Sequence, residues 1–345
     1  MEAETRYHPN AEQRALAGTI EESLAPLLPL SRLHASHVED AGTWASLDEI
    51  GVFGISTSEE QGGSGLGAVE EALIVMALGQ RLAAPAVLAT IGAAHAPLGN
   101  KAADASLGDN AADASSGGNA AGLRGRRAAP AYRRGNRIII AADTAADLVL
   151  LRAGADAALY ESSAFDSRPV DDRLWLAGLR EVAGSTEPAG LGEPIARLTA
   201  SGVLRLRLID AAALTGIAQA ALDMSVAYAG TRAQFGRPIG SFQAVKHHCA
   251  NMVIGARCAR DQTTFAAVAI DEGRDDAALQ VECALFVAGS AALDNAGKNI
   301  QIHGGIGFSD EADPHLLLKR AQLLVAIAGG LEAANDRISN IKAGW

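Results

Sequence analysis

The sequence predicts a mainly α-helical protein with a small β domain between two helical regions. Two observations predict this class: apolar residues recur at helical spacing over long stretches, and a run of short alternating segments occupies the middle of the chain. A third is composition, because only 4% of the residues are aromatic. A core built from Ala, Leu, Val and Ile favours close-packed helices.

The N-terminal helical domain is expected over residues 1–98. Ala11–Leu30 and Val69–Leu82 both carry apolar residues at helical spacing, and the loop Glu59–Gly67 lies between them. Gly63 to Ala68 also fits a relaxed dinucleotide-binding fingerprint, but acidic residues rather than a strand precede it, which argues against a Rossmann site.

Residues 99–136 are predicted to be a flexible linker. The segment Leu98–Ser106 is followed at once by Leu107–Ser115, a nearly perfect tandem repeat of small and polar residues. Such residues bury too little apolar surface to offset the entropy of ordering the chain.

A reduced, β-barrel-like domain is expected over residues 137–210. Its last segment alternates apolar and basic residues, as a half-exposed strand does. The expected strands are Arg137–Ala141, Leu148–Arg152, Ala157–Glu161, Leu174–Leu176, Ile195–Leu198 and Val203–Ile209.

Residues 211–345 are predicted to form a C-terminal four-helix bundle. The first helix follows Asp210 and ends near Gly230, and the second begins after Ser241. A third is expected from Asp275, and the pair Asp313-Pro314 is typical of the start of a fourth. Long antiparallel helices joined by short loops form bundles.

Charge and hydropathy exclude several classes of partner. The formal net charge of -11 argues against nucleic acid. No apolar run approaches the ~20 residues that span a bilayer, so no membrane segment is expected. The polar N-terminus does not resemble a secretory signal, and Cys249, Cys258 and Cys283 lack metal-ligand spacing. We expect a cytoplasmic protein with reduced thiols and no metal site; His247-His248 lacks a third ligand.

Two loops between the predicted bundle helices carry a recognisable pattern. Arg232–Gln243 reads Arg-Ala-Gln-Phe-Gly-Arg-Pro-Ile-Gly-Ser-Phe-Gln, and Gln301–Gly307 reads Gln-Ile-His-Gly-Gly-Ile-Gly. In this order and context the loops resemble the C-terminal, flavin-binding domain of the acyl-CoA dehydrogenase family. Glu59–Gly67 resembles an N-terminal segment of the same family. Thr186–Gly190 resembles its flavin-contacting loop but lies too late in the β domain.

The resemblance implies FAD as cofactor and a dimer or tetramer, because in the family these loops reach the flavin of a neighbouring subunit. A guanidinium suits the pyrophosphate, glycines let backbone approach the ligand, and amides donate and accept hydrogen bonds. A phenyl ring offers an apolar wall. The implied cofactor-binding residues are Arg232, Phe235, Gln243, Gln301, Gly304 and Gly305.

The resemblance also implies a catalytic glutamate, which the sequence lacks. Removing the α-proton of an acyl-CoA thioester requires a well-placed carboxylate. At the usual family position stands Ala328, and at the alternative position ahead of the first bundle helix stands Leu206, between Arg205 and Arg207. Asp210 is a weak substitute and Glu332 a weaker one.

Three interpretations remain open. The first is the base-deficient subunit of a heteromeric acyl-CoA dehydrogenase, whose partner subunit supplies the glutamate. Similar paired subunits act on sterol side chains in actinobacteria, which implies steroid catabolism and a heterotetramer. The second is an active homomeric enzyme with a displaced base. The third is a flavin monooxygenase or a non-catalytic scaffold on the same fold.

Overall fold

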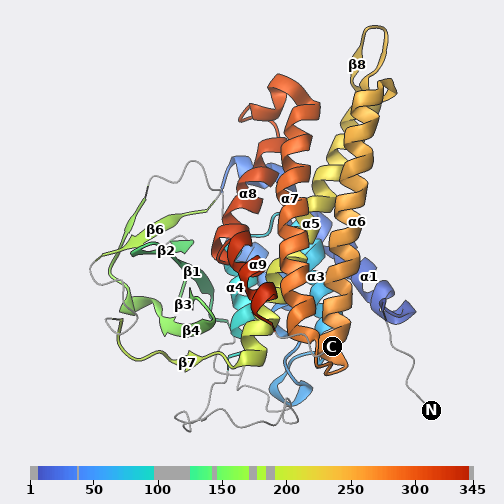
Figure 1. The fold of residues 1–345 in the computed structure, drawn as a ribbon. Helices are drawn as coiled ribbons and strands as arrows, with labels where there is room; N and C mark the ends of the chain where they lie inside the picture. Colours follow the sequence, from blue (N-terminus) through green and yellow to red (C-terminus); the bar gives the residue numbers. More distant parts are fainter. Residues whose placement is uncertain are drawn as a thin grey trace, which may run out of the picture.

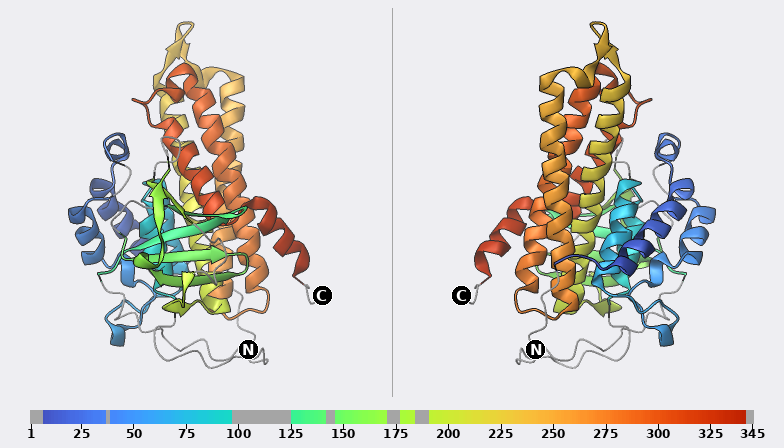
Figure 2. Two further views of the ribbon diagram at one scale, coloured as in Figure 1. Left: turned by 90° about the vertical axis from the view of Figure 1, so that its left-hand side faces the viewer. Right: turned by 90° about the vertical axis from the view of Figure 1, so that its right-hand side faces the viewer.

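A computed structural model describes residues 7–36, 39–96, 125–141, 146–170, 177–183 and 191–341. A β-sheet lies on one side of a tall helical bundle, and the N-terminal helices pack against the bundle near the sheet (Figures 1 and 2). This is the mainly α-helical architecture with a small β domain that the sequence predicts.

The described part of the N-terminal region forms four helices: α1 Ala11–Leu27, α2 Ala41–Glu49, α3 Ala68–Gln80 and α4 Pro85–Ala93. Short 3₁₀ turns separate them: η1 Leu30–His34, η2 Val52–Gly54 and η3 Glu59–Gln61. Asn10 and Gln13 form a reciprocal capping box at the start of α1, with both contacts at 2.8 Å. The two long helices predicted here are present and end two to three residues earlier than expected.

The backbones of α3 and of α5, the first bundle helix (Ala200–Thr231), touch directly. A Cβ atom added to Gly79 would lie 2.2 Å from the Ala213 carbonyl oxygen. A Cβ atom added to Gly216 would lie 2.1 Å from the Met76 carbonyl oxygen. Only glycine permits so close a helix crossing, so these two residues fix the N-terminal region against the bundle.

The described residues of the middle region form one mixed seven-stranded sheet in the order β5-β6-β2-β1-β3-β4-β7. β1 and β3 run parallel, with Ala131 opposite Leu151, and the other neighbours are antiparallel. β5 and β7 form free edges, so the described strands do not close into the expected barrel. The strands are β1 Ala128–Arg134, β2 Arg137–Ala141, β3 Leu148–Ala153, β4 Asp156–Glu161, β5 Ser167–Pro169, β6 Leu179–Val182 and β7 Ala196–Arg197.

Two predicted boundaries of the β domain are wrong. β1 begins at Ala128, inside the predicted linker, whereas residues 97–124 lie outside the described ranges. The predicted strand Val203–Ile209 is helical, because α5 begins at Ala200. Its alternating arginines are not on a solvent face but form ion pairs with Glu71 and Glu282. Leu174–Leu176 lies outside the described residues.

The bundle comprises α5, α6 Gln243–Asp271, α7 Ala277–His303 and α8 Pro314–Ile327, as predicted. The short strands β8 Ala233–Gln234 and β9 Arg237–Pro238 pair in the connection between α5 and α6. A further helix, α9 Leu331–Asn340, was not predicted. It follows Gly329 and Gly330, whose φ angles of 93° and 90° end α8 and redirect the chain.

α7 is the central helix of the bundle and contacts α5, α6, α8 and α9. The stretch Ala277–Phe308 is long and apolar enough to cross a membrane by length and composition alone. One such helix is weak evidence for a membrane span, because the core helix of a soluble protein passes the same test. Half of its most apolar window is buried inside this structure.

Candidate functional site

The first motif loop is a tight hairpin at the far end of the bundle, labelled β8 in Figure 1. Phe235 and Gly236 form its turn, with φ angles of 53° and 79°. Two consecutive positive φ angles are typical of a two-residue hairpin turn. The Ile239 N–H donates to the Arg232 carbonyl at 2.8 Å and closes the loop onto the end of α5.

The second motif loop begins where α7 ends, at Gly304, whose φ angle is 63°. No atom lies within 4 Å of a Cβ added to Gly304 or Gly305, so backbone there is open to a ligand. Next to it, the His303 ring stacks on Tyr228 of α5 with centroids 4.0 Å apart. This stack joins the ends of α5 and α7, from which the two motif loops start. Burial lowers the pKa of His303, which favours its neutral form there.

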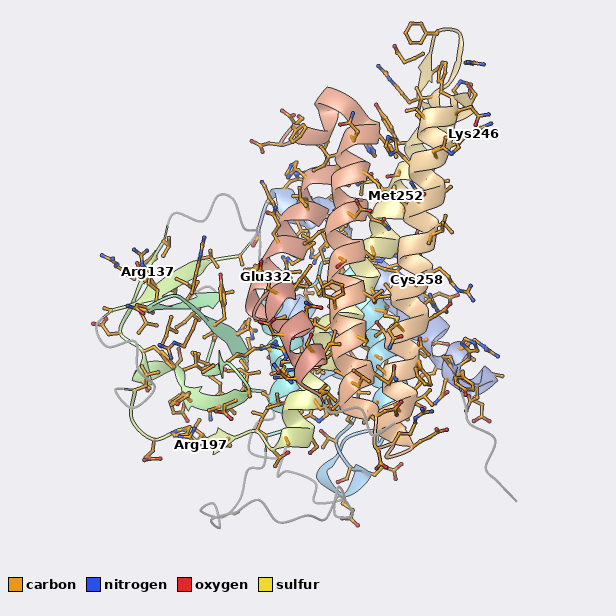
Figure 3. All side chains as sticks on the ribbon, in the orientation of Figure 1. Arg137, Arg197, Lys246, Met252, Cys258 and Glu332 are labelled. Atoms are coloured by element: carbon orange, nitrogen blue, oxygen red, sulfur yellow. The ribbon has the colours of Figure 1, made fainter. Side chains whose placement is uncertain are left out.

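Buried polar side chains hold the helices together beneath these loops. Ser225 donates to Asn299 at 2.8 Å. Asn295 donates to the carbonyls of Ala218 and Met252, both at 3.0 Å, and so ties α7 to α5 and α6. Figure 3 shows Met252 part-way along α6, between Lys246 near the hairpin and Cys258. These residues are not among the predicted site residues, although polar side chains on an apolar helix face are a usable signal.

The six predicted cofactor-binding residues are all exposed at this end of the bundle. Phe235 is 92% exposed and meets the edge of Phe242 at 6.1 Å. Within the described ranges, the side chains of Arg232, Gln243 and Gln301 form no ion pair or inter-residue hydrogen bond. Their donors are therefore available to a ligand, as a shared cofactor site requires.

The two positions at which the family carries its base lie together, away from the motif loops. Leu206 and Ala328 both line a cavity of about 190 Å³ between β1, β3, β4, α5 and the α8–α9 junction. Arginines line it too: Arg152, Arg207 and Arg337, with Arg133 and the exposed Asp156 also present. Asp156 is the first residue of β4 and is exposed, so the cavity interior is basic rather than acidic.

The substitute base considered from the sequence, Asp210, is already bound. Arg152 donates to both of its oxygens, with Nη2 to Oδ1 at 3.1 Å, and Asp210 is only 2% exposed. Burial raises the pKa of Asp210, and the charge of Arg152 opposes that rise. Asp210 does not line the cavity. Glu332 is exposed on α9 and does not line it either.

A second buried carboxylate, Glu282, is shared by two arginines of the same cavity. Its Oε1 accepts from Arg207 Nη1 at 2.6 Å and from Arg337 Nε at 2.8 Å. Burial lowers the pKa of Arg207, whereas Glu282 raises it. The family's base is an unpaired carboxylate. The carboxylates beside this cavity, Asp210 and Glu282, are instead paired with the arginines that line it.

A third buried charge network, which has no signature in the sequence, joins the N-terminal region to the bundle. Glu71, only 1% exposed, accepts from Ser56 at 2.8 Å, contacts His95 Nε2 at 2.9 Å and pairs with Arg205 at 3.3 Å. Burial alone would raise the pKa of Glu71. The charges of His95 and Arg205 and the hydrogen bonds outweigh it and lower the pKa to about 2.

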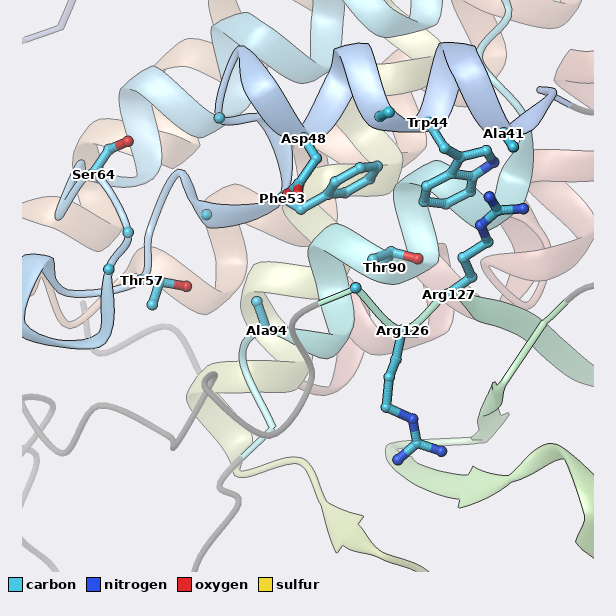
Figure 4. Close-up of a pocket in the computed structure, with 16 residues that line it drawn as sticks. Ala41, Trp44, Asp48, Phe53, Thr57, Ser64, Thr90, Ala94, Arg126 and Arg127 are labelled. Atoms are coloured by element: carbon cyan, nitrogen blue, oxygen red, sulfur yellow. The ribbon is translucent and has the colours of Figure 1, made fainter.

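A larger cavity of about 350 Å³ lies between α2, the loop Glu59–Gly67, α4 and the start of β1 (Figure 4). Its aromatic wall is the stacked pair Trp44 and Phe53, and the Arg127 guanidinium lies 4.8 Å from the Trp44 ring centroid. A Cβ atom on Gly63 would lie 2.3 Å from the Thr57 carbonyl oxygen, so the loop glycines serve a tight turn. The motif loops do not line this cavity, and Thr186–Gly190 lies outside the described residues.

Both ends of the chain match family models of one family. Residues 10–105 match the acyl-CoA dehydrogenase N-terminal domain, and residues 197–340 match the acyl-CoA dehydrogenase C-terminal domain. The chain is 30% identical to acyl-CoA dehydrogenase IpdE2 of Mycobacterium tuberculosis over 91% of this chain and 92% of that protein. Over 125 residues it is 45% identical to FadE34 of the same organism, covering 35% of this chain but only 17% of FadE34.

Solved structures share the fold over nearly the whole length. The ChsE4-ChsE5 complex from Mycobacterium tuberculosis gives a TM-score of 0.72 at 23% identity, covering 99% of each chain. A Tcur3481-Tcur3483 steroid ACAD variant gives 0.72 at 21% identity, covering 95% of this chain and 97% of that one. With full-length similarity to IpdE2 and matches at both ends, the chain belongs to the acyl-CoA dehydrogenase family.

Proposed function

We propose that this chain is the base-deficient subunit of a heteromeric, FAD-dependent acyl-CoA dehydrogenase. The observation that carries the proposal is the arginine-lined cavity at the two base positions, Leu206 and Ala328. A carboxylate must be unpaired and face the substrate to accept its α-proton. The two buried carboxylates beside this cavity are instead engaged by Arg152, Arg207 and Arg337.

The length of α5 supports a site shared between chains. Leu206 and Arg232 stand at opposite ends of this one helix, about 26 residues and therefore roughly 39 Å apart. That separation exceeds the reach of one dinucleotide between the motif loops and the cavity of the same chain. A flavin held by Arg232 would therefore lie in a centre that another chain completes.

The residues at the bundle tip fit the role of holding that flavin. When bound, FAD accepts the hydride from the substrate's β-carbon. The Arg232 guanidinium would neutralise the pyrophosphate, and Gln243 and Gln301 would supply hydrogen bonds. Exposed backbone at Gly304 would let the cofactor approach, and the exposed Phe235 would cover an apolar part of it.

The partner in this proposal is a second acyl-CoA dehydrogenase chain that carries the glutamate, with a heterotetramer as the expected assembly. Two of the similar structures bear paired names, ChsE4-ChsE5 and Tcur3481-Tcur3483, and the second is described as a steroid enzyme. These similarities support an acyl-CoA thioester with a steroid-derived acyl group as the substrate class.

The test is flavin content with and without the partner. We expect the chain alone to purify colourless and the co-expressed pair to hold one flavin for each two chains and to reduce a dye with acyl-CoA. Arg232→Ala should lower flavin occupancy of the pair. Arg257→Ala is the matched control, because Arg257 is an exposed arginine whose partner is Asp261 of the same helix.

A homomeric enzyme using Asp210 is the second candidate, and the raised pKa of Asp210 is the observation that favours it. Purified alone, such an enzyme would be yellow and would reduce a dye with an acyl-CoA. That result would overturn the base-deficient assignment.

A further inference from the structure

The arginine-lined cavity contains more positive charge than the surrounding carboxylates neutralise. We propose that it is a binding site for a short-chain aliphatic carboxylate. This proposal concerns ligand binding by the chain itself and does not depend on the heteromeric function proposed above.

The charges around the cavity leave one cation in excess. Arg152, Arg207 and Arg337 line the cavity, and within the described residues their carboxylate partners are Asp210 and Glu282. Two further charged residues line the cavity, the exposed Arg133 and Asp156. Their charges are opposite, so the excess of one positive charge is unchanged. An uncompensated charge in a largely buried setting is costly, and an anion in the cavity would neutralise it.

Unused hydrogen-bond donors point to the same ligand. Arg152 Nε and Arg337 Nη2 are both buried and have no hydrogen-bond partner in the described parts of the chain; one acceptor beside them, Glu282 Oε2, is buried and unpartnered as well. Glu282 accepts from both Arg207 and Arg337 through a single oxygen. Other N–H groups of these two arginines therefore do not bond to Glu282. A guanidinium fork matches the two oxygens of a carboxylate.

The rest of the lining determines which anion fits. Val203, Leu206, Ile327, Ala328 and Ala333 form an apolar wall. The volume of about 190 Å³ corresponds to roughly six water molecules. Phosphate, with polar oxygens on every side, would face this wall unsolvated. A short aliphatic acid places its carboxylate on the arginines and its alkyl chain on the wall.

Isothermal titration calorimetry of the full-length chain with butyrate, at constant ionic strength, tests the proposal. We expect saturable binding that is stronger for butyrate than for acetate and absent for chloride and phosphate. Arg337→Gln removes one charged fork and should weaken butyrate binding about tenfold or more. Ala333→Leu fills the cavity without touching an ion pair and should abolish binding. Arg257→Gln, which removes an exposed arginine elsewhere, is the control and should bind as the parent does.

Three results would overturn the proposal. One is the absence of saturable butyrate binding by the parent chain. Another is phosphate or chloride binding as tightly as butyrate, which would indicate a general anion site. The third is unchanged binding in Ala333→Leu with its melting temperature retained, since that would place the ligand elsewhere.

Discussion

Polar side chains are exposed near one end of α5 and are held in buried ion pairs near the other. At the bundle tip, Arg232 and Gln301 are exposed and have no partner in the described ranges, so their donors are free for a ligand. At the base positions, Arg207 is bound to the buried Glu282, and Asp210 is bound by Arg152. One helix therefore carries exposed hydrogen-bond donors at one end and a buried charge network at the other.

Removing the carboxylate from that network should give the largest effect. Glu282→Ala leaves Arg207 and Arg337 facing each other without a counter-charge, and breaking a buried pair in this way costs about 3–5 kcal/mol. We expect urea denaturation to show a loss of that size in the free energy of unfolding. Asp261→Ala, which breaks the exposed pair with Arg257, should cost less than about 1 kcal/mol. Equal losses would contradict the difference between buried and exposed charges.

The Glu71 network should make stability depend on pH. Its folded pKa is about 2, below the ordinary value of 4.5, so its contribution is complete above about pH 4.5 and is lost as the pH falls towards 2. The shift corresponds to roughly 3 kcal/mol. Unfolding free energies measured across this range should fall less steeply in Glu71→Gln than in the parent. Parallel curves would show that Glu71 does not carry this dependence.

Removing the stack of His303 on Tyr228, beside the motif loops, should have a smaller effect. His303→Ala removes the ring that lies on Tyr228, and aromatic stacks contribute about 1 kcal/mol. We expect a small loss of thermal stability, with a clearer loss of flavin retention in the complex. His303→Phe keeps a ring and should retain more flavin. If both variants hold flavin as the parent does, the stack does not position the loops.

Restoring a carboxylate at the base position should change activity least. In Ala328→Glu the new side chain enters a cavity lined by Arg152, Arg207 and Arg337, and we expect it to pair with one of them. Dye reduction by the isolated chain should stay at background. Turnover with acyl-CoA would show that the missing glutamate was the only obstacle to catalysis.

The sequence predicted those features that depend on local pattern. Helical spacing of apolar residues identified the bundle, and the motif loops identified the exposed tip. The strand predicted over Val203–Ile209 was wrong because the partners of its arginines, Glu71 and Glu282, lie far away in the chain. Asp210 was a candidate base because its ion pair with Arg152 joins α5 to β3, and a contact between residues so far apart in the chain leaves no local signal in the sequence.

The glycine contact between α3 and α5 has a consequence for how the protein unfolds. Gly79 and Gly216 bring backbone against backbone, so no flexible side chain can fill a gap if the helices begin to separate. The crossing therefore cannot open in small steps. Although residues 1–98 and the bundle are separate stretches of sequence, we expect them to melt in a single calorimetric transition.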